Sequence, residues 1–259
     1  FVARYGFDPE AAIMAWSGDN PNSLVGLGLV SEGSCALSLG TSDTLFAFLK
    51  DKPASAMCEG HLFVSPTGDY MDLLCFANGS LARERVRDEF KLDWKQYGEE
   101  VNRTEPGNGG KLMLAFYGPE ITPKTSGPIV RKVGLEEGDV SGTCRAVVEG
   151  QMLGRKLHAN RLGIQPKQLL LTGGASVDKC VRQICADIFE CPVACISTTA
   201  SAAMGAALRA YDATTNRPLE EIVRPFVVTG EVTQPQPETF DAYRRLFQAY
   251  QEFEEASCS

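Results

Sequence analysis

Two glycine turns in the sequence are suited to bringing a phosphate group or a flat ring close to the backbone. Gly40-Thr41 lies between two apolar runs, and a hairpin turn of this type offers backbone N–H groups and a hydroxyl to a phosphate. Gly173-Gly174 lies between an apolar run and a helical pattern, where glycine permits a ligand to approach closely. Each turn alone is explained by the positive φ that glycine tolerates, so the indication comes from the two together.

A third turn, Ser17–Pro21, contains the carboxylate of Asp19 beside the amide of Asn20. An Asp in such a turn most often bonds nearby N–H groups as a turn former or as a helix N-cap. By spacing alone this structural interpretation is preferred. A functional role for Asp19 gains support only when this turn is considered together with the two glycine turns.

Several common nucleotide and catalytic patterns are absent from the sequence. No GxxxxGK[ST] segment occurs, and Gly173–Gly174 continues as Ala-Ser-Val-Asp instead of GxGxxG, which makes an NAD enzyme a poor fit. The two histidines support no Ser-His-Asp or Cys-His system: we expect His61 to be structural and His158 to be solvated or packed on a helix. The arginines within residues 83–87 alternate with acidic residues, which favours a solvated helix face over a phosphate site.

Apolar periodicity predicts a mixed α/β chain that begins with adjacent antiparallel strands. The expected strands cover residues 35–39, 45–49, 61–64, 70–76, 168–172 and 192–196. The expected helices cover residues 81–90, 144–161, 177–189, 200–211 and 240–253. Loops are predicted at 105–110, 122–128 and 234–237. The strand, helix, strand spacing in the second half predicts a parallel pair joined by a right-handed crossover.

Length, charge and cysteine content limit the class of protein. The 259 residues suffice for one large domain or two small ones, and 25 basic against 33 acidic residues give a net charge of −8. This balance disfavours general nucleic-acid binding but leaves an anionic substrate open. No apolar run matches a membrane span, and Phe1 opens no signal-peptide pattern. The nine cysteines, without a CxxC pair or zinc spacing, are expected to be reduced thiols of a cytoplasmic protein.

An ordered set of segments resembles the C-terminal domain of the FGGY carbohydrate kinases. It consists of Ser17–Ser42, Leu171–Ser176, a helix, Cys191–Val193 and an alanine-rich helix containing Ala206 and Ala207. Within that family, residues 73–84, 107–110, 120–123 and 145–151 are most similar to xylulose kinases of eukaryotic type. The resemblance extends from about Ala15 to the final helix.

The resemblance implies an α/β fold, namely an actin-like ATPase (ribonuclease H-like) domain. Its mixed sheet would join an antiparallel hairpin region to parallel βαβ units. Residues 16–259 would form the C-terminal ATP-binding domain, with the terminal helix 240–253 included. Residues 1–15 would be the last helix, or the hinge, of an N-terminal sugar-binding domain.

The resemblance also implies roles for individual residues. Asp19 matches the family's general base, which takes the proton of the attacking sugar hydroxyl, and Asn20 matches a sugar-binding position. The family's nucleotide-contacting positions match seven residues of this sequence, namely Gly40, Thr41, Ser42, Trp94, Gly173, Gly174 and Asp178. Asp178 stands where related xylulose kinases carry an Asn, which exchanges an amide donor for a charge. Mg²⁺ is expected to be held by nucleotide phosphates and water, with no metal site among the protein side chains.

The implied activity is transfer of the ATP γ-phosphoryl group to D-xylulose, giving D-xylulose 5-phosphate. The expected partners are ATP or ADP with Mg²⁺, a ketopentose and the N-terminal domain of the same protein; no nucleic acid or membrane is expected, and a homodimer stays open. The isolated piece is expected to show little or no turnover. The alternatives are another FGGY substrate such as glycerol, ribulose or gluconate, a non-catalytic actin-like nucleotide-binding module, and a nucleotide-dependent oxidoreductase.

Overall fold

A mixed β-sheet runs through the centre of the molecule in this computed structural model, which describes residues 1–15, 17–52, 59–196, 200–215, 217–227 and 229–258. Within those residues the sheet has the strand order β3-β4-β2-β1-β7-β8-β9. Its strands are β1 (Ser34–Leu39), β2 (Asp43–Leu49), β3 (His61–Val64), β4 (Tyr70–Phe76), β7 (Gln168–Thr172), β8 (Val193–Ile196) and β9 (Thr229–Thr233). A separate pair consists of β5 (Leu112–Phe116) and β6 (Ile129–Val133).

The predicted change from antiparallel to parallel pairing occurs at β1. Leu37 of β1 lies opposite Leu45 of the antiparallel β2 on one side and opposite Leu171 of the parallel β7 on the other. β7 pairs in parallel with β8, and the antiparallel β9 closes that edge. The predicted hairpin region followed by a parallel βαβ unit is therefore confirmed.

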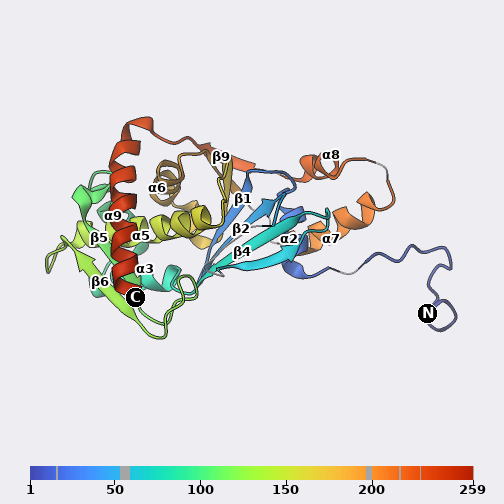
Figure 1. Cartoon of the computed structure of the whole chain (residues 1–259), viewed down its shortest axis with the longest axis horizontal. Helices are drawn as coiled ribbons and strands as arrows, with labels where there is room; N and C mark the ends of the chain where they lie inside the picture. The colour runs from blue at the N-terminus through green and yellow to red at the C-terminus, as the bar shows by residue number, and fades with distance from the viewer. Residues whose placement is uncertain (16, 53–58, 197–199, 216, 228, 259) are drawn as a thin grey trace.

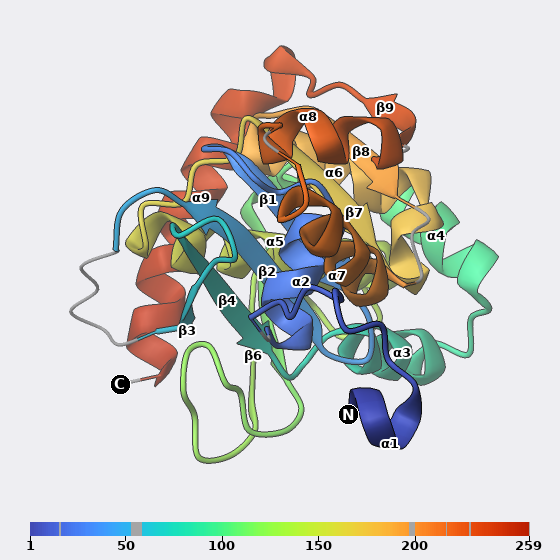
Figure 2. The ribbon, with the colours of Figure 1, turned by 90° about the vertical axis from the view of Figure 1, so that its right-hand side faces the viewer.

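Helices cover both faces of this sheet. The helices of the described residues are α1 (Val2–Tyr5), which lies apart from the sheet, α2 (Asp19–Gly26), α3 (Ser80–Glu89), α4 (Trp94–Asn102), α5 (Val140–Arg161), α6 (Lys179–Phe189), α7 (Ser201–Asp212), α8 (Leu219–Val223) and α9 (Phe240–Cys258). α5, α6 and α9 lie on one side of the sheet, and α2 and α7 lie on the other (Figure 1). Turned by 90°, α2 and α7 lie side by side in front of the strands (Figure 2).

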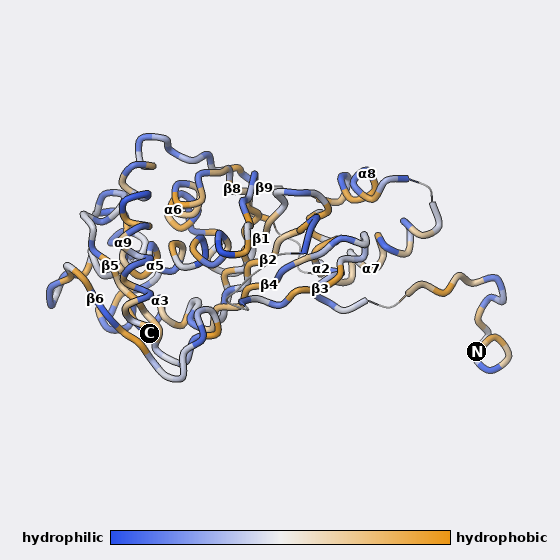
Figure 3. Tube along the Cα trace, viewed as in Figure 1, coloured by the Kyte–Doolittle hydropathy of each residue, from blue (hydrophilic) through white to orange (hydrophobic). Residues whose placement is uncertain are grey.

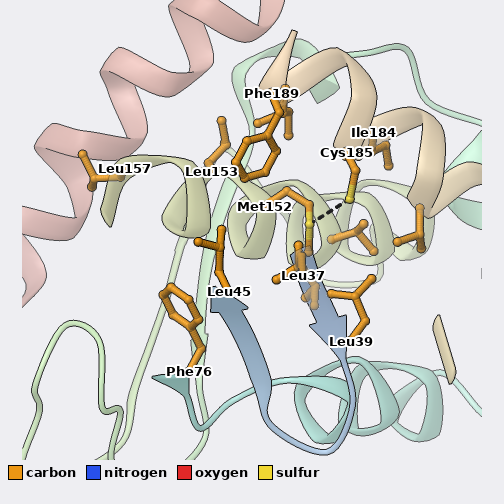
Figure 4. Packing of buried hydrophobic residues seen from close by; sticks show 14 of the residues in the cluster. Leu37, Leu39, Leu45, Phe76, Met152, Leu153, Leu157, Ile184, Cys185 and Phe189 are labelled. Atoms are coloured by element: carbon orange, nitrogen blue, oxygen red, sulfur yellow. Dashed lines mark hydrogen bonds between the residues drawn. The ribbon is translucent and has the colours of Figure 1, made fainter. Parts of the chain in front are cut away.

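Alternate residues of each central strand supply the two cores. Leu37, Leu39 and Leu45 face the larger core, where they meet α5 and α6 (Figure 4). Ala36 and Phe46 face the smaller core beneath α2. In the larger core the thiol of Cys185 lies 3.1 Å from the sulfur of Met152, which joins α6 to α5. The period-two alternation thus places one apolar set on each face of the sheet.

Small residues allow α2 and α7 to touch backbone to backbone. A Cβ atom at Gly26 would lie 1.9 Å from the carbonyl oxygen of Ser201, and one at Gly205 would lie 1.7 Å from that of Asn22. Both contacts are shorter than any side chain permits. Glycine is therefore required at positions 26 and 205 by this close crossing.

Several boundaries differ from the sequence expectations. The helix expected from Cys144 begins at Val140, because Asp139 accepts a hydrogen bond from the backbone of Gly142 as an N-cap. The helix expected from Val177 begins two residues later, after a 3₁₀ turn over Gly174–Val177. The last helix continues to Cys258. Residues 19–26 form a helix where only a turn was expected, and α4, α8, β5, β6 and β9 were not predicted at all.

The N-terminal segment extends away from the body of the protein (Figures 1 and 3). Within residues 1–15 only Val2–Tyr5 is helical. The segment carries exposed apolar side chains, with Phe1 88% and Ile13 97% exposed. Across the described ranges, we find no helix with the length and apolar character needed to cross a bilayer.

The described cysteines carry free thiols, in line with the expected reduced state, while Cys58 lies outside the described residues. Burial raises the pKa of Cys180 and of Cys191 to about 11. Such thiols are neutral near pH 7 and behave as small apolar side chains.

Candidate functional site

The start of α3 holds the turn between β1 and β2 in place. The backbone N–H of Ser80 donates to the carbonyl oxygen of Gly40 over 2.8 Å. A Cβ atom at Gly79 would lie only 2.7 Å from that oxygen and 2.8 Å from the carbonyl oxygen of Thr41. Glycine at 79 therefore permits an approach that no other residue allows. The predicted hairpin Gly40–Ser42 is present, and it packs against a helix N-terminus.

A buried carboxylate lies directly after this hairpin. Asp43, the first residue of β2, is fully buried, and its Oδ2 accepts a 2.8 Å hydrogen bond from Nη2 of Arg155 on α5. Nη1 of Arg83 on α3 lies 3.9 Å from the same oxygen. Both arginines are 2% exposed, so the single carboxylate offsets part of the charge of two guanidinium groups away from water. The group ties the hairpin to two helices.

Two further side chains order the turn that precedes α3. Nε2 of Gln151 on α5 donates to the carbonyl oxygens of Asn78 and Gly79, at 2.8 and 2.9 Å. Its Oε1 accepts from Nη1 of Arg83. The buried carboxylate of Glu120 accepts the backbone N–H of Asn78 at 3.1 Å. The hairpin therefore rests on a polar network whose members come from distant parts of the chain.

Of the two glycines after β7, only the first is required by its surroundings. Gly173 has φ of 89°, and a Cβ atom there would lie 2.3 Å from the carbonyl oxygen of Leu39. Glycine at 173 is needed for the carboxyl ends of β7 and β1 to approach each other. Gly174 has no such constraint, because an added Cβ atom would meet nothing within 4 Å. The space beside Gly174 is open.

Trp94 is placed by the cap of α4. Asp93 accepts a hydrogen bond from the backbone of Gln96, and Gln96 returns one to the backbone of Asp93, which makes a capping box. Trp94 is therefore the first residue of the helix, and its indole is 47% exposed. The buried ring of Tyr97 meets it edge-on, with 5.6 Å between ring centroids.

A cavity of about 540 Å³ brings most of the predicted nucleotide residues together. Five of the seven line it, namely Gly40, Thr41, Trp94, Gly174 and Asp178. They come from the β1–β2 hairpin, from the start of α4 and from the segment before α6. Arg83, Glu84 and Tyr97 complete its polar and aromatic wall. Of the other two, Ser42 is exposed at the hairpin and Gly173 lines a neighbouring cavity.

That second cavity, of about 760 Å³, contains the residue predicted to contact the sugar and one of the predicted nucleotide glycines. Asn20, at the start of α2, lines it together with Gly173. Val177 lines both cavities, so the two hollows adjoin at this residue. Asp19 does not line either cavity, but it immediately precedes Asn20 as the first residue of α2. Its side chain is exposed, and Oδ1 accepts the backbone N–H of Asn20 at 2.9 Å.

Asp178 combines a structural role with its place in the cavity. As the N-cap of α6, its Oδ1 accepts the backbone N–H of Cys180 at 2.8 Å and that of Val181 at 3.4 Å. An Asn could accept the same bonds through its amide oxygen. Asp at this position therefore keeps the helix cap intact and places a negative charge beside the cavity.

One of the sequence interpretations was wrong. Arg83 is not on a solvated face, because the start of α3 packs against α5 and the guanidinium meets Asp43 and Gln151 there. Of the two expectations for His158, packing holds, since the side chain is fully buried and contacts Glu254 of α9. Asp43 and Gln151 were not singled out from the sequence. The only signal for Asp43 was its position directly after the Gly-Thr-Ser turn.

Comparison with known proteins agrees with this arrangement. The sequence profile of the FGGY family of carbohydrate kinases, C-terminal domain, matches residues 35–213. A xylulose kinase of Rattus norvegicus is 42% identical over 98% of this chain and 49% of its own length. The crystal structure of ligand-bound xylulose kinase from Lactobacillus acidophilus superposes with a TM-score of 0.85 over 98% of this chain and 54% of that one, at 23% identity. The crystal structure of gluconate kinase from Lactobacillus acidophilus superposes with a TM-score of 0.83 over 100% of this chain and 54% of that one, at 24% identity.

The fold and the paired cavities define a domain of the actin-like ATPase fold found in sugar kinases. The extent of the profile match and the identity to the Rattus norvegicus protein show that the chain belongs to the FGGY family of carbohydrate kinases. The chain spans about half the length of the curated relatives it matches.

Proposed function

We propose that this chain is the ATP-binding, C-terminal half of a kinase that transfers the γ-phosphoryl group of ATP to D-xylulose, giving D-xylulose 5-phosphate. The observation that carries the proposal is the cavity lined by Gly40, Thr41, Trp94, Gly174 and Asp178, where five residues from three separate segments converge. The Rattus norvegicus relative that matches over nearly the whole chain is a xylulose kinase, which supports this substrate over others.

In this proposal the hairpin receives the phosphates and the open space at Gly174 receives the nucleoside. Backbone N–H groups in a tight glycine turn suit an anion without requiring lysine. The ring of Trp94 offers a stacking surface for adenine, because a half-exposed indole at a cavity wall leaves part of its face available. The expected Mg²⁺ would arrive with the nucleotide, held by phosphate oxygens and water.

Asp19 is the proposed general base and Asn20 the proposed sugar contact. Asp19 keeps an exposed carboxylate at the N-terminus of α2, and Asn20 lines the cavity that adjoins the nucleotide side at Val177. A carboxylate here would accept a hydrogen bond from the sugar hydroxyl and take its proton as the phosphoryl group transfers. Residues 16–259 would form the ATP-binding domain, and residues 1–15 would lead from the preceding sugar-binding domain.

The first test is titration calorimetry of the 259-residue chain with MgADP, with and without D-xylulose. We expect MgADP to bind, with an affinity that D-xylulose does not change, because most sugar contacts would lie in the other half. The same chain should show little or no phosphorylation of D-xylulose, since donor and acceptor meet only when two domains close. A chain that gives no heat with MgADP would contradict the nucleotide site proposed here.

The second test separates a catalyst from a nucleotide-binding module, and it requires the longer protein. Asp19→Asn should lower turnover by about 10² to 10⁴, the usual contribution of a general base, and leave MgADP affinity unchanged. Asp8→Asn is the matched control, because Asp8 is an exposed carboxylate that also accepts a neighbouring backbone N–H, at 2.9 Å. Full turnover in Asp19→Asn would remove Asp19 from the chemistry and favour the non-catalytic module.

The same longer protein distinguishes the sugar substrates. We expect the highest kcat/KM with D-xylulose among D-xylulose, ribulose, glycerol and gluconate. The structural likeness to a gluconate kinase makes gluconate the comparison of most interest. A higher kcat/KM with gluconate or glycerol would keep the kinase proposal and replace its substrate.

A further inference from the structure

Two arginines on α3 stack on aromatic rings, and they do so in different surroundings. The guanidinium carbon of Arg87 lies 4.5 Å from the centroid of the Trp94 ring. The guanidinium carbon of Arg85 lies 5.3 Å from the centroid of the Tyr117 ring. Trp94 lines the cavity to which we assign the nucleotide, whereas Tyr117 does not. The two stacks are chemically similar, but only the one on Trp94 adjoins the cavity.

Further contacts restrain both members of the Arg87–Trp94 stack. Nε and Nη2 of Arg87 donate to Oδ1 of Asp88, at 2.8 and 2.6 Å, which limits the orientation of the guanidinium. Trp94 is limited by the capping box that starts α4. Tyr97 adds an edge-on contact, with an angle of 76° between the rings, and its own hydroxyl donates to the carbonyl oxygen of Cys144 at 3.1 Å.

The cavity reaches the indole from a side that Arg87 does not occupy. Trp94 and Tyr97 both line the cavity, and Arg87 does not. Arg87 therefore supports the ring from outside the cavity and leaves the cavity side of the indole open. One side of the indole is thus in contact with protein, and the other side can accept a flat ring.

We propose that Arg87 is a positioning residue for the base of the bound nucleotide, acting through Trp94. It holds the indole in the orientation in which a purine stacks on it, so the ring need not be ordered when the nucleotide binds. Fixing a side chain in its bound orientation before binding improves affinity by lowering the entropy lost on association. The inference rests on the proposed nucleotide site.

A competing explanation is that Arg87 attracts the nucleotide phosphates directly as a cation. The two explanations differ in whether the effect of Arg87 requires the indole. If Arg87 acts through Trp94, removing the ring should abolish the effect of removing Arg87. If it acts on the phosphates, the effect should persist without the ring. A double-mutant cycle between the two residues measures this difference.

The experiment uses MgADP titrations followed by calorimetry and by tryptophan fluorescence. The chain contains two tryptophans, so Trp16→Phe is introduced first to make Trp94 the only emitter. On that background we compare Arg87→Gln, Trp94→Leu, the double variant, and Arg85→Gln as the matched control. The variants with Trp94→Leu contain no tryptophan, so calorimetry supplies their affinities for MgADP. In the other variants, steady-state anisotropy reports how freely the Trp94 ring moves before any nucleotide is added.

Arg87→Gln is expected to weaken MgADP binding by about two- to fivefold, the range for an exposed cation–π pair, and to lower the anisotropy of Trp94. The same change in the Trp94→Leu background should have no effect, and Arg85→Gln should alter neither affinity nor anisotropy. Unchanged affinity and anisotropy in Arg87→Gln would overturn the inference, and so would an equal loss with and without the indole. If the Trp16→Phe parent itself neither binds MgADP nor changes its emission, the proposed nucleotide site fails and this inference fails with it.

Discussion

Asp43 and Arg155 form a 2.8 Å ion pair in which the carboxylate is completely buried and the arginine is 2% exposed. The pair joins the residue that follows the Gly40–Ser42 hairpin to α5, a helix of 22 residues. The guanidinium of Arg155 also lies over the ring of Phe76, 4.4 Å from its centroid. A contact of this kind contributes less to net stability than to fixing one arrangement, because both charges lose their hydration.

Removing Asp43 should therefore destabilise the domain strongly. Asp43→Ala leaves the buried guanidinium groups of Arg155 and Arg83 without their carboxylate, and we expect a loss of about 3–5 kcal/mol in unfolding free energy. Urea denaturation measures the loss. Glu99→Ala is the comparison, since its 3.9 Å pair with Lys95 is exposed and should cost less than about 0.5 kcal/mol. Equal small losses in both variants would show that the buried pair does not hold the hairpin.

Local patterns in the sequence were sufficient for the glycine turns and the central strands. The alternation on either side of Gly40–Ser42 predicted the hairpin, because the side chains of a strand alternate between faces over a few residues. The strand, turn and helix around Gly173 were predicted from a short apolar run, a Gly-Gly pair and apolar residues at helical spacing. β5 was not predicted, since all five of its residues are buried and no alternation marks it. α4 is short, and its apolar residues are few.

The polar network behind the hairpin could not be predicted from spacing. Asp43 and Arg155 are 112 residues apart, and nothing in either segment indicates the other. The interpretation of Arg83 failed because its neighbours in sequence are charged, whereas α5 covers only the side of α3 to which Arg83 belongs. The resemblance to a family supplied the proposed nucleotide residues, but it did not supply the groups that position them.

Gly174 provides a direct test of the open space in the cavity. Gly174→Ala adds one methyl group where an added Cβ atom meets nothing within 4 Å, so the unfolding free energy should stay the same or rise by up to about 1 kcal/mol. If a nucleotide fills that space, the methyl group should weaken MgADP binding by about tenfold or more through overpacking. Gly127→Ala is the matched control, because a Cβ there also meets nothing and Gly127 does not line the cavity. Equal MgADP affinities in the two variants would mean that the ligand does not approach Gly174.

Asp178 allows charge and helix capping to be separated. Asp178→Asn keeps an oxygen for the N–H groups of Cys180 and Val181, so stability should change little. The variant removes a negative charge from the wall of a cavity proposed to hold an anionic nucleotide, and we expect MgADP to bind about two- to fivefold more tightly, as for a single charge pair near the surface. The affinity for uncharged adenosine should increase less than that for MgADP. Asp178→Ala, which loses the cap, should cost about 1 kcal/mol of stability. Weaker MgADP binding in Asp178→Asn would indicate that the carboxylate contacts the nucleotide as an acceptor.

The buried histidine under the C-terminal helix should make stability depend on pH. Nδ1 of His158 lies 2.8 Å from Oε2 of Glu59, and Nε2 lies 3.1 Å from Oε1 of Glu254 on α9. Burial alone would lower the pKa of His158, but hydrogen bonds to Glu254 and Glu59 and their charges outweigh burial and raise it. Arg161 also faces this group, at 3.3 Å from Nδ1.

A raised pKa means that the charged form of His158 is stabilised by folding. Its contribution is complete below the unfolded value of about 6.5, and it is lost as the pH rises through the higher folded value. Glu59 acts in a different range: burial alone would raise its pKa, yet the His158 and Arg161 contacts lower it. Its contribution is therefore present above about 4.3 and is lost only as the pH falls through the lower folded value.

The unfolding free energy of the parent chain should consequently decrease from pH 6 towards pH 9, and His158→Gln should show a smaller decrease. The difference between the two curves isolates His158, because the other titrating groups are common to both proteins. His61→Gln serves as the control, since His61 is an exposed residue on β3 and its loss leaves the Glu59 and Glu254 contacts intact. Chemical denaturation at a series of pH values supplies the curves. Parallel curves for the parent and His158→Gln would show that folding leaves the pKa of His158 unchanged, and the contact with Glu254 would then not hold α9 against α5 as an ion pair.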